Sequence, residues 1–222
     1  MAKKLPKGQV NKRNRDTLEA LVNLMKDIDQ KYSIKVGIIG DKARQKHPDS
    51  DLTNAELGAI HEFGCTINVT EKMRHFFFKK WGIQKSNNPV IIPTRSFLRM
   101  PLLSGDFKEY IMDIIRKKAF MIYDMDALGK DKEGKKLVRE LNIEHAREAL
   151  TKNDGIIESI AKVIASESLA RVQMAFMSSG FGNWAQISEL TKANRKNDKS
   201  SPPLQDSGEL MKSITAEVER VK

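Results

Sequence analysis

The sequence is poor in cysteine, in aromatic residues and in long apolar runs. Cys65 is the single cysteine in 222 residues, which excludes an internal disulfide and a zinc site built from cysteines. We therefore expect a reducing compartment, the cytoplasm. No apolar run approaches the ~18 residues that a membrane span requires. Residues 1–15 are too basic and polar for a secretory signal, so neither export nor membrane insertion is expected.

Negative charge is also scarce, and the excess of positive charge is concentrated at the N-terminus. The chain has 39 Lys and Arg against 29 Asp and Glu, which gives a formal charge of +10. Within residues 1–15 there are no acids, and the cations are Lys3, Lys4, Lys7, Lys12, Arg13 and Arg15. We expect residues 1–13 to form a flexible arm. The arm is either solvated and without a partner, or in contact with nucleic acid or an acidic protein surface.

Apolar periodicity predicts an α+β fold. Helical spacing predicts helices over 14–31, 53–64, 70–82, 105–123, 135–152 and 156–178, and Thr53 with Glu56 forms a capping box. Alternation predicts strands over 32–40, 65–69, 89–92 and 213–221. Loops are predicted over 41–52, 93–101 and 183–206. We expect a small, mostly antiparallel sheet with several helices packed on one face.

The chain is predicted to form one domain over 14–222, with a charged helical insertion at about 124–154. Strands over 34–39 and 213–220 are each half apolar and lack a local hairpin partner, so we expect them to pair with each other. Asp206 is expected to cap a short turn over 207–211. We expect a charged surface without a long exposed apolar stripe, and hence a monomeric or weakly associated isolated protein.

Groups that could carry catalysis or hold a metal are few. His61 and His75, with Glu62 or Glu71, are the nearest approach to an acid–base or metal site. They match neither HExxH nor a pair of histidines at i and i+4. Cys65 has no recognisable His and Asn or Asp set, so a small buried apolar role is favoured. The sequence therefore predicts no enzyme, no cofactor and no metal.

Residues 93–101 (PTRSFLRMP) have a proline at each end, which is typical of irregular structure. Phe97 and Leu98 are expected to be buried and to anchor this segment. Arg95 and Arg99 are interpreted either as surface arginines or as groups that face a partner, because arginine beside aromatic anchors is enriched at interfaces.

Three segments together resemble a protein family: 54–64 (NAELGAIHEFG), 92–101 (IPTRSFLRMP) and 203–214 (PLQDSGELMKSI), the last preceded by Trp184, Thr191 and Lys192. In this order and spacing they resemble the tail-completion, or neck, proteins of tailed bacteriophages, also called phage virion morphogenesis proteins. Ser96 stands where that family commonly has proline, and 124–154 looks like extra length. The motif residues that carry the resemblance are His61, Glu62, Phe63, Gly64, Pro93, Arg95, Phe97, Leu98, Arg99, Trp184, Asp206, Gly208 and Leu210.

The resemblance implies a structural virion protein and not an enzyme. Such proteins form a homo-oligomeric ring, a hexamer or dodecamer, in the neck region at the head–tail junction. The ring joins head connector or adaptor proteins to tail terminator or tail tube proteins during assembly in the bacterial host cytoplasm. DNA would pass through the channel without sequence-specific contact, and no membrane is involved.

Two other classes of function stay open from the residues alone. The charge of +10 favours a DNA-binding or DNA-packaging accessory protein, although we find neither a helix-turn-helix nor interleaved aromatic and basic residues. A small hydrolase or nuclease would use His61, Glu62 and His75.

Overall fold

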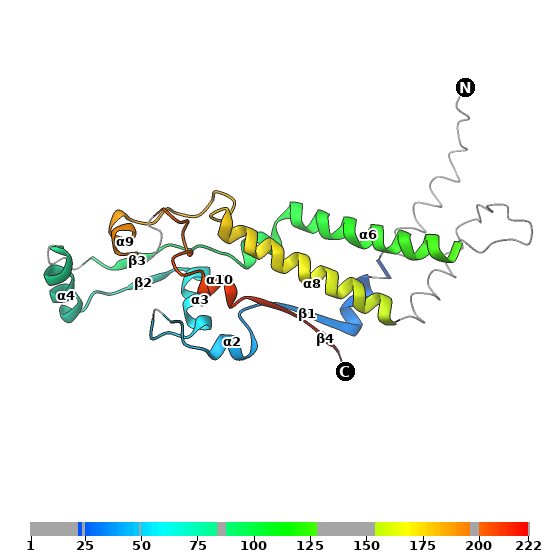
Figure 1. The fold of residues 1–222 in the computed structure, drawn as a ribbon, viewed down its shortest axis with the longest axis horizontal. Helices are drawn as coiled ribbons and strands as arrows, with labels where there is room; N and C mark the ends of the chain where they lie inside the picture. Colours follow the sequence, from blue (N-terminus) through cyan, green and yellow to red (C-terminus); the bar gives the residue numbers. More distant parts are fainter. Residues whose placement is uncertain are drawn as a thin grey trace, which may run out of the picture. The chain divides into compact units, whose positions relative to one another are not determined.

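The computed structural model describes residues 22–23, 25–48, 50–83, 88–127, 154–195 and 200–221. After helical residues 22–23 and 25–31, the elements are β1 (Tyr32–Gly37), α2 (Gly40–Arg44), α3 (Asn54–Phe63), β2 (Cys65–Ile67), α4 (Glu71–Trp81), β3 (Val90–Ile92), α5 (Arg99–Leu103), α6 (Gly105–Ala127), α8 (Asp154–Met177), α9 (Glu189–Asn194), α10 (Glu209–Lys212) and β4 (Thr215–Arg220). This confirms the predicted α+β class (Figure 1). Within the described residues, no helix is both long enough and apolar enough to cross a membrane.

The described strands form two separate two-stranded sheets, β1 with β4 and β2 with β3. The first pair confirms the prediction that strands near the two ends of the sequence lie in one sheet. The backbone N–H of Val221 donates to the carbonyl of Lys31 at 2.8 Å, and the Lys35 ammonium lies 2.6 Å from the Glu219 carboxylate. The second pair is antiparallel, with Cys65 opposite Ile92.

The chain divides into two compact units, each built from segments that are distant in sequence. Unit 1 takes the described residues of Met1–Lys35, Gly105–Glu167 and Ala216–Lys222. Unit 2 takes those of Val36–Ser104 and Ser168–Thr215. The single domain expected over 14–222 stays a prediction. The N-terminal arm, the expected helix over 135–152 and nearly all of the charged insertion lie outside the described residues.

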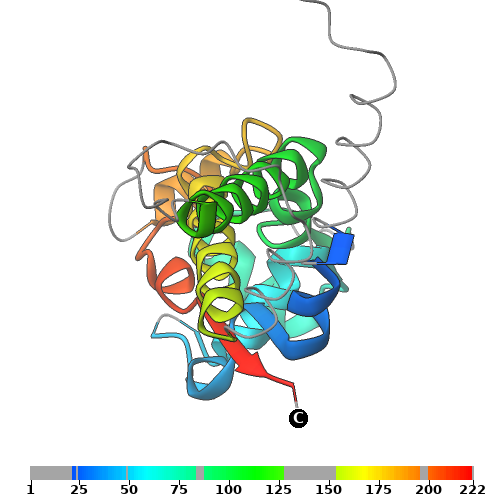
Figure 2. The same cartoon turned by 90° about the vertical axis from the view of Figure 1, so that its right-hand side faces the viewer.

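The core of unit 1 lies between α6 and the first half of α8, which run side by side in opposite directions (Figure 1, Figure 2). Ile115 of α6 and Ile157 and Ile160 of α8 are buried together with Ile28 and Tyr32. These α8 positions belong to the apolar stripe that the helical spacing predicts.

The core of unit 2 is aromatic. The rings of Phe97 and Phe176 are fully buried with their centroids 5.0 Å apart, and Trp184 meets Phe176 edge to face at 5.8 Å. Gly180, with a φ of 65°, makes room for this tryptophan, because a Cβ at Gly180 would lie 2.2 Å from the indole nitrogen of Trp184. The backbone turn after α8 is therefore fitted to the aromatic core.

Three short helices lie inside segments that the sequence predicts as loops: α2, α5 and α9. Prolines did not prevent α5, because Pro101 is its third residue, where the missing N–H would have had no partner within the helix. The Ser188 side chain caps α9 by accepting a hydrogen bond from the N–H of Thr191. The predicted loops were wrong at these positions: α9 has a local cap, whereas the N-cap residues of α2 and α5 make no side-chain cap.

Two predicted helix ends are confirmed and one predicted cap is wrong. Thr53 and Glu56 form the expected capping box, and Gly64 follows α3 with a φ of 76°. Asp206 does not cap the turn near 207–211. Instead α10 begins after Gly208, which has a φ of 73° and no side-chain cap. Both positions favour glycine because their φ is positive: Gly208 is left-handed, and Gly64 combines its φ with a ψ of 166°.

β2, α4 and β3 form a segment that we call the α4 hairpin, in which α4 lies beyond the ends of the paired strands (Figure 1). No residue of α4 is buried. Phe76 and Phe78 of α4 are about half exposed, and Ile91 of β3 is 69% exposed. The hairpin therefore presents exposed apolar side chains, while the expectation that the protein has no long exposed apolar stripe stays a prediction.

Candidate functional site

Helix α3 places Glu62 next to its last residue, within unit 2. The capping box fixes the start of the helix, and Gly64 ends it. Glu62 is buried although it carries an ionisable group. Because a buried carboxylate requires hydrogen-bond donors, its partners define what this part of the chain does.

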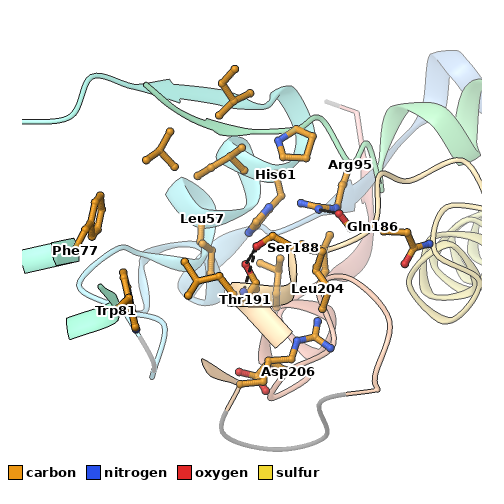
Figure 3. A pocket seen from close by; sticks show the side chains of 18 of the residues that line it. Leu57, His61, Phe77, Trp81, Arg95, Gln186, Ser188, Thr191, Leu204 and Asp206 are labelled. Carbon is orange, nitrogen blue, oxygen red and sulfur yellow. Dashed lines mark hydrogen bonds between the residues drawn. The ribbon is translucent and has the colours of Figure 1, made fainter. Parts of the chain in front are cut away.

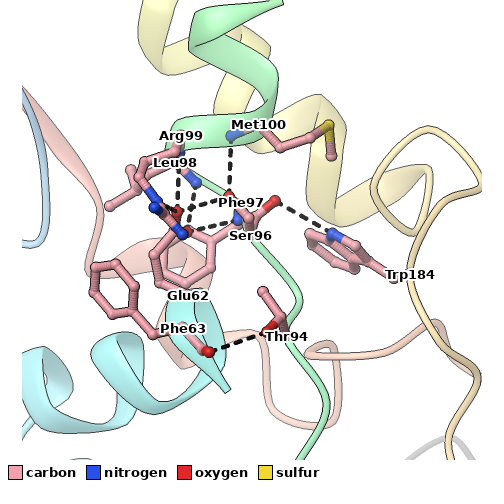
Figure 4. Close-up of polar contacts among 9 residues, drawn as sticks. All are labelled: Glu62, Phe63, Thr94, Ser96, Phe97, Leu98, Arg99, Met100 and Trp184. Atoms are coloured by element: carbon pink, nitrogen blue, oxygen red, sulfur yellow. Dashed lines mark hydrogen bonds and ion pairs between the residues drawn. The ribbon is translucent and has the colours of Figure 1, made fainter.

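The Glu62 carboxylate binds the beginning of α5 (Figure 4). Its Oε2 atom accepts hydrogen bonds from the backbone N–H groups of Phe97 at 2.8 Å and Leu98 at 2.9 Å. Its Oε1 atom accepts from the Ser96 hydroxyl at 2.6 Å and from the N–H and Nε of Arg99 at 3.0 and 3.2 Å. This one side chain therefore supplies the cap that α5 lacks locally.

These donors determine the ionisation of Glu62. Burial by itself raises the pKa of the Glu62 carboxyl, but hydrogen bonds from Ser96, Leu98 and Arg99 favour the charged form and outweigh it. The pKa of Glu62 is therefore below its usual value. A carboxylate held in this way is a structural group and a poor acid–base catalyst near neutral pH.

Arg95 is buried and connects two of the motif segments. Its backbone N–H donates to the His61 carbonyl at 2.8 Å, and its Nε donates to the Ala185 carbonyl at 3.0 Å. The Trp184 indole N–H donates to the Ser96 carbonyl at 3.3 Å (Figure 4). Arg95 is therefore not a surface arginine. Burial lowers the pKa of its guanidinium, and the nearby charge of Arg195 lowers it further.

Arg99 pairs with an acid, because its Nε atom lies 3.2 Å from the Glu62 carboxylate. Its guanidinium lies 4.6 Å from the ring centroid of Phe63, which is largely exposed. The Thr94 hydroxyl donates to the Phe63 carbonyl at 3.0 Å. A Cβ at Gly64 would lie 2.9 Å from that hydroxyl, so the two chain segments meet closely only because residue 64 is glycine.

The third motif segment joins the same unit through its apolar residues. Leu210 is buried in the core cluster that contains Phe97 and Trp184, and the predicted burial of Phe97 is confirmed. Leu98 is half-buried against this cluster. The three segments recognised in the sequence are therefore brought together in unit 2. Sequence reasoning missed this arrangement, although an acid at the end of a capped helix was a signal for it.

A cavity of about 830 Å³ adjoins these segments in unit 2 (Figure 3). Three arginines, Arg74, Arg95 and Arg195, line it together with His47, His61 and the carboxylate of Asp206. Pro93 and Gly208 also lie in its wall. Among the motif residues, Phe97 thus belongs to the core, Glu62 holds the start of α5, and Pro93 and Gly208 form part of the wall of this cavity.

His61 is neutral at physiological pH. Burial lowers the pKa of its imidazole to about 4, and the positive charges of Arg95 and His47 contribute. Its Nδ1 atom is buried without a hydrogen-bond partner among the described residues. The described residues contain no group of three or more His, Cys, Asp and Glu that could hold a metal ion, and so do not assemble His61, His75 and Glu71 into such a site.

The low pKa of His61 predicts that stability falls with acidification. The unfolded chain takes up a proton near pH 6.5 and the folded one only near pH 4, so unit 2 is stabilised above pH 6.5 and loses that stability as the pH falls between these values. Between pH 7 and 5, where most carboxylates stay ionised, we expect the free energy of unfolding to fall by about 2 kcal/mol. Urea unfolding at both pH values measures this.

Two histidine variants provide the comparison for the pH experiment. His61→Leu should remove most of the loss between pH 7 and 5. His75→Leu, at an exposed position of α4, should leave it unchanged. An equal loss in all three proteins would show that His61 does not control the pH dependence.

The basic residues of the N-terminal arm lie outside the described residues, so both alternatives stay predictions: a solvated arm, or one in contact with nucleic acid or an acidic protein surface. Comparison of the chain with known protein families, with curated proteins and with solved structures finds no match.

Proposed function

We propose that this chain is a structural virion protein of a tailed bacteriophage that completes the head–tail junction. In this proposal a ring of copies joins the head connector or adaptor proteins to the tail terminator or tail tube. The observation that carries the proposal is the convergence of the three resembling segments on Glu62 and the aromatic core of unit 2. The first two segments share a hydrogen-bond network, and the third packs through Leu210 on the core that Phe97 belongs to.

The roles of the motif residues also support a structural task. Glu62 binds backbone N–H groups, Arg95 binds backbone carbonyls, and Phe97 and Leu210 fill the core. Each of these contacts fixes the shape of the chain, and none of them activates a nucleophile. This is what a ring subunit requires, because it must present rigid surfaces to its neighbours.

The α4 hairpin offers a surface for such neighbours. Phe76, Phe78 and Ile91 are exposed on it, and exposed apolar side chains that gather on one element are typical of protein–protein contacts. A closed ring requires two different contacting faces on each subunit. We propose the α4 hairpin as one of them.

A phage mutant that does not make the chain tests the proposal. We expect a nonsense mutation to leave DNA-filled heads and separate tails, because head filling precedes joining in this account. Electron microscopy of the lysate counts tailed particles, filled heads and empty heads. A normal yield of tailed particles would contradict the proposal, and an accumulation of empty heads would favour the packaging alternative.

A DNA-binding or DNA-packaging accessory protein is the second candidate, and α4 favours it. Basic residues flank the three consecutive phenylalanines of this helix (EKMRHFFFKKW), and the Lys80 ammonium lies 5.3 Å from the Phe76 ring centroid. Aromatic stacking combined with positive charge is how single strands are bound without sequence preference. Retention on single-stranded DNA that falls steeply with salt would support this candidate.

A further inference from the structure

We propose that the cavity of unit 2 binds an acidic side chain carried on an apolar peptide segment of a partner protein. The inference goes beyond the proposed function, since it depends only on residues of unit 2. It follows from the charge, the lining and the extent of the cavity.

Two buried arginines at the cavity have no carboxylate partner among the described residues. Arg95 is 6% exposed and Arg195 is 9% exposed. The side chain of Arg95 donates to the carbonyls of Ala185 and Gln186, and that of Arg195 donates to the carbonyls of Ser201 and Pro202 and to the Ser201 hydroxyl. Buried charges in proteins are normally paired with an opposite charge.

Among the described residues that line the cavity, positive charges outnumber negative ones. Arg74, Arg95 and Arg195 line it together with one carboxylate, that of Asp206. Arg195 is close enough to Arg95 for its positive charge to disfavour the charged form of Arg95. A carboxylate between them would relieve this repulsion and form charge-assisted hydrogen bonds.

Apolar side chains form the largest group in the lining, which indicates what the carboxylate is attached to. Leu57 comes from α3, Phe77 and Trp81 come from α4, and Leu204 precedes α10 (Figure 3). A phosphate-rich polymer would leave these side chains without apolar contacts. An acidic group attached to an apolar segment would pair with the arginines and pack against these apolar side chains.

The extent and the polar groups of the cavity favour a peptide over a free organic acid. The volume of about 830 Å³ exceeds that of one side chain. Ile91, 69% exposed, and Leu190, also exposed, lie in the lining, so the cavity continues onto apolar surface that a longer chain would cover. Gln186 and Ser188 offer amide and hydroxyl groups to a peptide backbone (Figure 3). The hydrocarbon tail of a fatty acid cannot form hydrogen bonds with these groups.

Binding of two dyes to the purified full chain tests the charge requirement. The probes are 8-anilinonaphthalene-1-sulfonate and N-phenyl-1-naphthylamine, which share an aromatic body and differ in the sulfonate. We expect the anionic dye to bind about tenfold more tightly, since a charge-assisted pair contributes roughly 1.5–3 kcal/mol. Arg195→Gln should abolish this preference, and Arg116→Gln, at an exposed position of α6, should not.

Displacement of the bound dye tests the peptide requirement. The competitors are capped Leu-Glu-Leu-Phe-Leu, the same peptide with Gln in place of Glu, and decanoate. We expect the Glu peptide to displace the dye about tenfold better than the Gln peptide and better than decanoate.

Several results would overturn the inference. Equal binding of the two dyes, or an unchanged preference in Arg195→Gln, would refute the cationic site. Equal displacement by the two peptides would refute the carboxylate. Displacement by decanoate at least as strong as by the Glu peptide, or none by the Glu peptide, would refute a peptide occupant. None of these results depends on whether the chain lies in a phage neck.

Discussion

Replacing Glu62 by glutamine is expected to lower the free energy of unfolding of unit 2 by about 3–5 kcal/mol, because it removes one partner from a buried, hydrogen-bonded charge. The substitution conserves shape, so packing is unchanged. The amide retains one acceptor oxygen, but its NH₂ group would face the N–H donors of Phe97 and Leu98 or of Arg99. At least one set of donors would then be buried without a partner.

Chemical denaturation with a matched control measures this effect. Glu71→Gln, at an exposed position in the first turn of α4, should change stability by less than about 0.5 kcal/mol. If Glu62→Gln and Glu71→Gln lower stability by the same small amount, the Glu62 carboxylate does not hold α5 in place.

Truncation of Phe97 to alanine is expected to cost about 3–5 kcal/mol, because the ring is 0% exposed and packs on Phe176 in a closed core. Phe78 provides a control of the same chemistry. It is 53% exposed on α4, so Phe78→Ala should change stability by less than about 0.5 kcal/mol. The phenylalanine in the motif segment thus acts through folding, and the one on α4 does not.

The same pair of variants separates folding from assembly. In phage production, Phe78→Ala should yield folded protein and fewer tailed particles, because the α4 hairpin is a proposed subunit contact. If Phe97→Ala is as stable as the wild-type protein but yields fewer tailed particles, Phe97 lies at an interface and its assignment to the core is wrong.

Features that depend on neighbouring residues could be predicted from the sequence. The capping box at Thr53 and Glu56 and the stop at Gly64 follow from residues a few positions apart, and both are present. The pairing of β1 with β4 was predictable despite its sequence separation, because neither strand had a local partner.

Features that depend on distant partners could not be predicted. Glu62 binds N–H groups 35 to 37 residues further along the chain, so nothing local indicated that it would start α5. The burial of Arg95 depends on carbonyls 90 residues away. The apolar residues of α4 were predictable as a stripe, but only the fold shows that Phe76 stays exposed.

The position of the chain in the purified particle tests the central claim most directly. The measurement is cryo-electron microscopy of intact phage carrying a C-terminal fusion of the chain to a small globular tag. The account predicts a ring of extra density between the head connector and the first ring of the tail. Extra density on the capsid surface or at the tail tip, or a particle that lacks the chain, would contradict it.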